Sequence, residues 1–466
     1  VNKPYPYDTC TIDSSEPREH GIGPEELRDS VVSTIVAKSE TIYQASVILK
    51  NQEYNRRDRR LDKLLTSKAT GIPIMLALLC LIFWLTITGA NYPSQLLSDL
   101  LFGFQDQLTQ WFTAMHAPDW LHGALVLGMY RTLAWVVSVM LPPMAIFFPL
   151  FTLLEDSGYL PRIAFNMDKF FKKANAHGKQ ALTMCMGFGC NACGVIGCRI
   201  IDSPRERLVA VLTNNFVPCN GRFPTLIAII TMFFAGMVAL PVQSLFSTLL
   251  LTVVIVFSVA VTLFMSKFLS KTVLKGVPSS FALELPPYRR PQIGKVIVRS
   301  IFDRTLFVLG RAAAVAAPAG LLIWVLSNVM IGEMSLLAYC TSFLDPFAQM
   351  IGLDGVILMA FILGFPANEI VIPIILMSYL CTGNLMDLEN LEQLRTILVD
   401  NGWTWLTAVC TMIFSLMHFP CGTTCWTIKK ETKSWKWTAL AFVLPTVSGM
   451  LLCFFVANGA RLLGLA

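Results

Sequence analysis

The chain contains several apolar runs that are long enough to cross a lipid bilayer as α-helices. About 20 apolar residues suffice for one crossing, and residues 71–90 form such a run without a single charge. The other predicted spans are 132–154, 208–240 with an interruption, 245–266, 305–331, 402–420 and 437–458. Two more apolar stretches, 181–198 and 356–380, contain Gly, Pro, Cys and Asn and do not fit plain helices. The pattern predicts an all-α polytopic membrane protein with seven or eight transmembrane helices and re-entrant or broken segments.

Composition and charge placement support this prediction and orient it. Of the 466 residues, 55% are hydrophobic and 14% charged, which excludes an ordinary soluble protein. Lys and Arg gather in three blocks, with eight in 155–207, eight in 267–304 and four in 429–436, whereas 223–266 and 312–394 contain none. Because positive residues beside membrane helices stay in the cytosol, we expect these blocks and the N-terminus on the cytosolic side of the cytoplasmic membrane. The net charge of +6 then indicates contact with an anionic membrane surface and not with nucleic acid.

These patterns divide the chain into seven parts. They are a flexible lead (1–24), a cytosolic helical stub (25–68), the first transmembrane helix with an external amphipathic segment (69–130), a first repeat (131–266), a cytosolic basic loop (267–304), a second repeat (305–458) and a tail (459–466). Within the third part, the amphipathic residues 94–115 are expected to lie in the membrane interface. The thirteen cysteines are an odd number and several lie in apolar stretches, so we expect reduced thiols.

The two broken stretches are copies of each other at an offset of 177 residues. Six of twenty-four aligned positions are identical, namely Asp168 and Asp345, Phe170 and Phe347, Gly178 and Gly355, Gly187 and Gly364, Phe188 and Phe365, and Asn191 and Asn368. The charge blocks place one copy inside and the other outside, so the copies have opposite orientation. Inverted repeats with broken helices are typical of secondary transporters with a site near the midplane. The predicted topology is one leading helix followed by two copies of helix, hairpin, helix, helix, with an external C-terminus; chance recurrence of Gly-Phe pairs is the alternative.

Three cysteines occur where Gly or Pro interrupts a helix. Cys190 follows Gly187 and Gly189, while Cys219 and Cys421 each follow a proline. Thiols and free backbone carbonyls together suit a borderline or soft divalent cation. Further candidates for the transport path are Asn191, Met186 and His418. The alternatives are that these thiols only pack as small apolar groups, or that Cys190-x-x-Cys193 belongs to a permanent zinc or iron–sulfur site.

Glu369 is the only acidic residue in the apolar run from Gly355 to Leu380. A carboxylate at that depth is costly unless it is paired or hydrated, so Glu369 is a candidate for binding a cation or carrying a proton, and the adjacent Asn368 is a further candidate for the transport path. A salt bridge to Arg222 or Arg311 is the alternative. The sequence contains no Walker A motif, G-x-S-x-G elbow or H-E-x-x-H motif, so we expect a transporter and not an enzyme.

Six motifs of this chain form a specific combination, namely LLEDSGYLPRIAFNMDKFF (153–171), HGK (177–179), GFGCN (187–191), NNFVPCNGR (214–222), GFPANE (364–369) and HFPCGTT (418–424). Together they resemble the membrane domain of the FeoB family of ferrous iron transporters, and the resemblance covers residues 55–458. It implies two Gate segments, at about 140–240 and 310–420, and a role for Cys190, Cys219 and Cys421 in iron passage. It also implies an N-terminal GTP-binding domain followed by a helical domain. Only the tail of the helical domain is expected in this chain, at residues 25–68. Cys193 departs from the usual family pattern.

The resemblance and the residues together predict a ferrous iron transmembrane transporter. Fe2+ is its expected substrate, passing a midplane path of thiols and unwound backbone carbonyls, with no permanently bound cofactor. Expected partners are the lipid bilayer, a GTP-binding protein or domain on the cytosolic side and a second copy of the chain in a homo-oligomer. Two alternatives stay open: a Gate-type carrier of nucleosides or other small solutes, and a membrane partner module of a separate GTPase.

Overall fold

The computed structural model describes residues 24–46, 56–67, 69–236, 240–275, 288, 292–383, 385 and 391–464. The chain divides into two compact units, residues 1–56 with 279–282 and residues 57–278 with 283–466. In the first unit, the described structure is helix α1 (Pro24–Ser46) together with the first residue of α2. The expected lead at 1–24 and much of the expected loop at 267–304 lie outside the described residues. All sites discussed below belong to the second unit.

The second unit is almost entirely helical and contains both predicted repeats. The leading part consists of α2 (Arg56–Leu65), α3 (Gly71–Ala114), α4 (Asp119–His122) and the π-helical η1 (Gly123–Tyr130). The first repeat consists of α5 (Arg131–Asp156), α6 (Tyr159–Lys173), α7 (Gln180–Gly189), α8 (Asn191–Gly197), η2 (Cys198–Ile200), α9 (Pro204–Thr213), η3 (Asn214–Phe216), η4 (Asn220–Arg222), α10 (Phe223–Ile229), η5 (Ile230–Ala235) and α11 (Leu240–Lys271).

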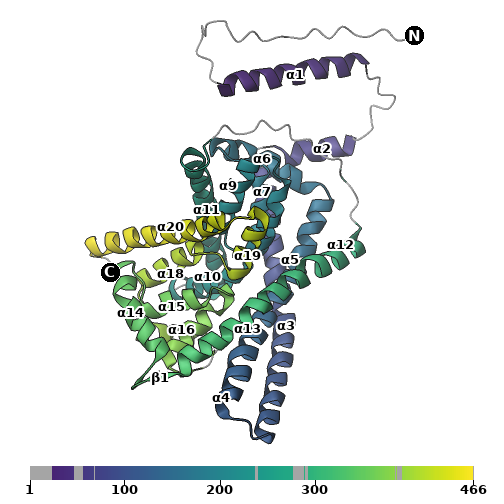
Figure 1. Ribbon diagram of the computed structural model, residues 1–466. Helices are drawn as coiled ribbons and strands as arrows, with labels where there is room; N and C mark the ends of the chain where they lie inside the picture. The colour runs from purple at the N-terminus through teal and green to yellow at the C-terminus, as the bar shows by residue number, and fades with distance from the viewer. Residues whose placement is uncertain are drawn as a thin grey trace. The chain divides into compact units, whose positions relative to one another are not determined.

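A short helical connector leads into the second repeat. The connector consists of α12 (Ile293–Arg299) and η6 (Ser300–Leu306). The second repeat consists of α13 (Phe307–Asn328), the two-residue strands β1 (Met330–Ile331) and β2 (Met334–Ser335), α14 (Leu336–Met350), α15 (Gly355–Leu363), η7 (Asn368–Ile370), α16 (Val371–Leu380), α17 (Leu391–Asp400), α18 (Trp405–Met417), α19 (Gly422–Thr432) and α20 (Trp435–Leu462) (Figure 1). The strands form a small antiparallel hairpin.

Seven helical segments among the described residues are long and apolar enough to cross a membrane. They are Gly71–Ala114, Asp119–Asp156, Pro204–Phe234, Leu249–Lys271, Leu309–Asn328, Trp405–Thr432 and Trp435–Leu462. Each overlaps one of the seven spans expected from the sequence. The prediction of an all-α polytopic membrane protein is therefore confirmed.

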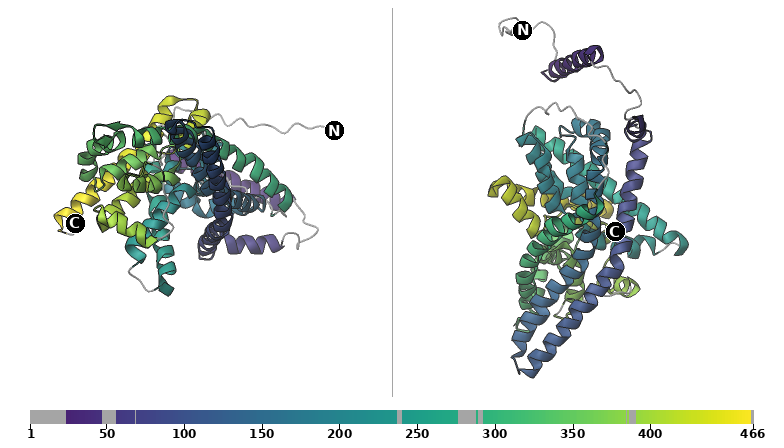
Figure 2. Two further views of the ribbon diagram at one scale, coloured as in Figure 1. Left: turned by 90° about the horizontal axis from the view of Figure 1, so that it is seen from below. Right: turned by 90° about the vertical axis from the view of Figure 1, so that its right-hand side faces the viewer.

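The expected amphipathic segment at 94–115 is not a separate element, because α3 continues without interruption to Ala114; its location in the membrane interface stays a prediction. Its 44 residues correspond to about 66 Å of helix, roughly twice the thickness of the hydrocarbon core. Two side-chain contacts connect the second half of α3 with η1 and α4. Tyr130 donates to the carbonyl of Leu101 at 2.9 Å, and His122 Nε2 lies 3.1 Å from the Thr109 hydroxyl. The right-hand view of Figure 2 shows α3 and α5 as long neighbouring helices.

Both broken segments turn back on themselves as hairpins. In the first, a Cβ on Gly197 at the end of α8 would lie 2.6 Å from Met186 Sδ on α7, so the two arms are antiparallel neighbours. In the second, Val356 at the start of α15 and Met377 near the end of α16 border the same cavity. The backbone at the two breaks is nearly identical, with φ and ψ of −153° and 126° at Cys190 and −154° and 123° at Ala367. These two residues are 177 positions apart, which is the offset of the repeat.

Matching side chains also hold the start of each hairpin. A Cβ on Gly178 would collide with the Asp168 carboxylate, and the backbone N–H of Gly355 donates to Asp345 Oδ1 at 2.9 Å. In both copies an aspartate on the preceding helix thus lies against the glycine that begins the hairpin. The Asp and Gly identities of the repeat therefore mark a contact between aspartate and glycine that occurs at the start of both hairpins.

Candidate functional site

A small cavity of about 30 Å³ lies where the helix breaks of the two repeats meet. Six of the residues singled out from the sequence line it: Cys190, Asn191, Cys219, Asn368, Glu369 and Cys421. The first three belong to the first repeat and the last three to the second. The space is about the share of one molecule in liquid water, so a single water or a desolvated ion fits it.

Each of the three thiols sits on extended backbone immediately before a helical turn. Cys190 precedes α8, Cys219 precedes η4 and Cys421 precedes α19. Because residues at such starts leave backbone groups outside the helical hydrogen-bond ladder, thiols and polar backbone atoms gather around the cavity. Among the described residues, however, no three His, Cys, Asp or Glu side chains are grouped closely enough to hold a metal ion. The thiols border one space without forming a closed ligand set.

Glu369 is the only charged side chain that lines this cavity. It is 8% exposed, and among the described residues its carboxylate has neither an ion pair nor a side-chain hydrogen bond. The carboxylate lies directly against Gly221, where a Cβ would be 2.6 Å from Glu369 Cδ. Glycine at this position is therefore what lets the carboxylate reach the cavity.

Arg222 fixes the two proline breaks relative to each other. Its guanidinium is 1% exposed and donates to the carbonyls of Asn215 at 3.1 Å and Leu416 at 2.7 Å. It also donates to the carbonyls of His418 and Phe419, at 3.2 and 3.3 Å. The alternative of a salt bridge between Arg222 and Glu369 is not observed among the described residues. Arg222 instead satisfies carbonyls beside both prolines, so it positions Cys219 and Cys421.

Two asparagines brace the hairpin breaks. With its amide nitrogen toward the break, Asn191 donates to the carbonyls of Gly187 and Val217, both at 3.2 Å. Asn368 donates to the Cys219 sulfur at 3.8 Å, and its oxygen lies 3.1 Å from His418 Nε2. His418 thus contacts the cavity wall from behind and does not line the cavity itself.

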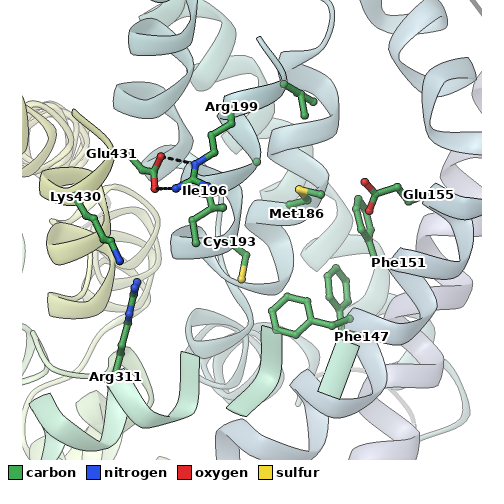
Figure 3. A pocket seen from close by; sticks show the side chains of 13 residues that line it. Phe147, Phe151, Glu155, Met186, Cys193, Ile196, Arg199, Arg311, Lys430 and Glu431 are labelled. Carbon is green, nitrogen blue, oxygen red and sulfur yellow. Dashed lines mark hydrogen bonds and ion pairs between the residues drawn. The ribbon is translucent and has the colours of Figure 1, made fainter. Parts of the chain in front are cut away.

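The remaining sequence candidate, Met186, lies in a different space. It lines a larger cavity of about 440 Å³, together with Cys193, Glu155, Arg199 and Glu431 and eight further residues (Figure 3). We call this cavity the inner vestibule because the Lys/Arg pattern predicts that it faces the cytosol. Arg199 and Glu431 form a bidentate ion pair with both contacts at 2.7 Å. Met186 faces this vestibule because it precedes the break by four residues, on the α7 side that packs against Gly197.

The cavity and the inner vestibule are separated by little protein. Cys190 lines the small cavity, and Cys193, which is less than one helical turn later, lines the vestibule. Gly189 lines the cavity on the same segment, and a Cβ there would collide with the ring of Phe147, which lines the vestibule. The aromatic ring of Phe147 therefore borders the vestibule and packs against Gly189 of the small cavity.

Comparison with known proteins identifies the repeats. The Gate family model, described as "Nucleoside recognition", matches residues 137–270 and 309–435. The chain belongs to the Gate family. A second family model, "Ferrous iron transport protein B C terminus", matches residues 251–303. The two Gate matches fall on the first and second repeats of the structure.

Curated relatives of this Gate protein are named Fe(2+) transporter FeoB. The Staphylococcus aureus (strain MSSA476) protein is 32% identical over 428 residues, covering 89% of this chain and 61% of that protein. The Methanocaldococcus jannaschii protein is 27% identical over 418 residues, covering 87% and 58%. The chain thus spans about three fifths of the length of these relatives and corresponds to their membrane part. No solved structure matches it.

The structure also reveals residues that the sequence did not single out. Met140 and Met144 on α5 line the small cavity, as does Gly221. The two methionines are four positions apart on a helix that contains Pro142 and Pro143, which is a signal that could have been noticed. Gly221 carried no such signal, because its role depends on the approach of Glu369 from the other repeat. The twelve cysteines within the described ranges form no disulfide with one another.

Proposed function

We propose that this chain is the membrane permease part of a ferrous iron transporter, in which Fe2+ passes the small cavity between the Gate repeats. The observation that carries the proposal is the convergence of Cys190, Cys219, Cys421 and Glu369 on that one cavity from both repeats. Sulfur and carboxylate oxygen together suit a borderline cation such as Fe2+. The names of the FeoB relatives support the choice of ion.

The incomplete ligand set agrees with transport, because an ion that must leave cannot be held by a closed shell. Fe2+ would lose water stepwise to the thiols and would leave through the inner vestibule toward the basic loops. Those loops, and with them the N-terminus, lie in the cytosol by the positive-inside rule. A GTP-binding protein or domain would act from the same side, and a homo-oligomer is compatible with this arrangement.

A nucleoside carrier is the second candidate, because the Gate family model is described as "Nucleoside recognition". Pockets for ligands of that kind occupy roughly 300–1,000 Å³, whereas the cavity at the breaks measures about 30 Å³. The size of the cavity therefore favours an ion.

The test is uptake of Fe2+ into liposomes or into cells that lack their own ferrous transporter. The triple variant Cys190→Ser, Cys219→Ser, Cys421→Ser should lose most of the uptake. The matched control, Cys80→Ser with Cys340→Ser, should keep it, since neither thiol borders the cavity. Full uptake by the triple variant would refute the thiol path, and nucleoside uptake by the wild-type chain that resists metal chelators would select the second candidate.

A further inference from the structure

A second cavity lies at the far end of the second hairpin and is rich in sulfur. It measures about 350 Å³ and is lined by thirteen residues, including Met330, Met334, Met377 and Cys381. Met and Cys make up 33 of the 466 residues, so thirteen average positions would include about one sulfur side chain. Glu333 on the β1–β2 hairpin adds a carboxylate to the same space.

Three of the four sulfur side chains lie at the protein surface and not in its core. The side chains of Met330 and Met334 are 59% and 43% exposed, and the Cys381 thiol is also exposed. Met377 is 1% exposed and forms the base of the cavity, where the Ser327 hydroxyl donates to its sulfur at 3.6 Å. Exposed thioethers gain little from burial of apolar surface, so packing does not account for this group.

The backbone at Cys381 supports a specific placement of its thiol. Its φ of 51° and ψ of 35° lie in the left-handed region, as is common for the residue that ends a helix, and its thiol donates to the carbonyl of Ser378 at 3.6 Å. Two residues later, Gly383 accepts a hydrogen bond from the Asn328 amide at 2.9 Å. The end of α16 is thereby tied to the end of α13, directly before the β1–β2 hairpin.

This cavity and the central one lie at opposite ends of the same helical arm. Asn368 and Glu369 at the central cavity lead into α16, and α16 ends beside Cys381. The ten residues of α16 span about 15 Å. In the proposed orientation this end faces outward, because residues 312–394 contain neither Lys nor Arg.

We propose that the cavity lined by Met330, Met334, Met377 and Cys381 is an outer capture site for a late first-row transition-metal cation, from which Fe2+ moves to the central cavity. The inference deepens the proposed function and relies on its orientation. Thioether and thiol sulfur select such cations over Mg2+ and Ca2+, and the Glu333 carboxylate adds electrostatic attraction. Exposed and incomplete ligation allows the ion to be released inward.

The test measures protection of Cys381 in intact cells carrying a Cys80→Ser variant. A membrane-impermeant maleimide is applied without and with Fe2+ under anaerobic conditions, and the modified cysteine is identified by mass spectrometry. Fe2+ should slow modification at concentrations near the uptake KM. The double variant Met330→Leu, Met334→Leu should raise both the protecting concentration and the KM at least threefold without changing the maximal rate. Met→Leu nearly conserves volume, so folding should persist.

The matched control is Met350→Leu, since Met350 is 54% exposed but does not line this cavity. Unchanged KM and protection in the double variant, or modification of Cys381 only from the cytosolic side, would overturn the capture site. The triple thiol variant of the central cavity separates the two proposals. Loss of uptake with retained Cys381 protection supports both, whereas normal uptake with retained protection supports the capture site and refutes the central thiol path.

Discussion

Substitution of Gly221 by alanine should block the central cavity while leaving the fold intact. A Cβ at this position would lie 2.6 Å from Glu369 Cδ and 3.1 Å from its Oε2. Ordinary carbon contacts are about 3.5–4.0 Å, so the carboxylate must move by about 1 Å into a cavity of about 30 Å³. Overpacking of this kind costs about 1–3 kcal/mol. If the added methyl group and Fe2+ compete for this space, the occupancy of the cavity by Fe2+ and the rate of Fe2+ uptake should fall about 5- to 150-fold.

The assay is initial Fe2+ uptake into liposomes containing equal amounts of folded protein, with thermal unfolding in detergent as the measure of folding. Gly310→Ala is the matched control, because a Cβ there meets nothing within 4 Å. It should transport like the wild type and unfold at the same or a higher temperature, since alanine favours helix. Wild-type uptake by Gly221→Ala, with an unchanged KM, would show that the ion does not pass the cavity beside Glu369.

Three further predictions concern single charged or titratable groups. Asp62→Asn should destabilise the protein by about 3 kcal/mol, since it removes the carboxylate 3.0 Å from the buried guanidinium of Arg162; replacing both residues by apolar ones should restore part of the lost thermal stability. Burial lowers the pKa of His177 below its usual 6.5, and its Nδ1 accepts from the Lys179 backbone at 3.0 Å. As the pH falls, His177 therefore binds a proton at a higher pH in the unfolded state than in the folded state. The free energy of unfolding should decrease as the pH drops below 6.5, and His177→Asn should lack this part of the pH dependence of the unfolding temperature. Glu369→Gln should keep the fold but reduce uptake tenfold or more, and an unchanged rate would exclude a role for the carboxylate.

The sequence predicted the spans and the meeting of the two repeats because both depend on strong local signals. Apolar runs and Lys/Arg blocks reflect the bilayer, which acts on every segment in the same way. The breaks at Cys190, Cys219 and Cys421 follow from Gly and Pro, whose effect on a helix is local. The identical residues of the two copies share one offset of 177 positions, which implies that the copies fold alike. Asn191 and Asn368 are therefore expected at corresponding positions. The structure agrees with the spans, the breaks and the correspondence of the two copies.

What the sequence did not show has the opposite cause, since it depends on contacts between distant segments. The sequence treated 71–90 and 94–115 as separate segments, whereas α3 is continuous from Gly71 to Ala114 and its second half contacts Tyr130 and His122. Met186 was named as a candidate for the transport path, and the packing of α7 against α8 places it at the inner vestibule and not at the small cavity; its role stays a prediction. The role of Arg222 was missed because it binds carbonyls almost 200 residues away. Such pairings leave no periodic trace in one sequence.

The repeat retains its backbone while its chemistry has diverged, and the difference suits passage of a cation. At the two equivalent breaks, Cys190 corresponds to Ala367 with almost the same φ and ψ. Two positions later, Ala192 corresponds to Glu369. The duplicated fold thus supplies two matching breaks, but only the first adds a thiol there and only the second adds a carboxylate. Two buried carboxylates would bind a divalent ion too firmly for release. Without any carboxylate, the charge of the ion would stay uncompensated in a medium of low dielectric constant. One carboxylate among several sulfur atoms lies between these limits. The Glu369→Gln and Gly221→Ala variants therefore test the asymmetry of the side chains and not the symmetry of the fold.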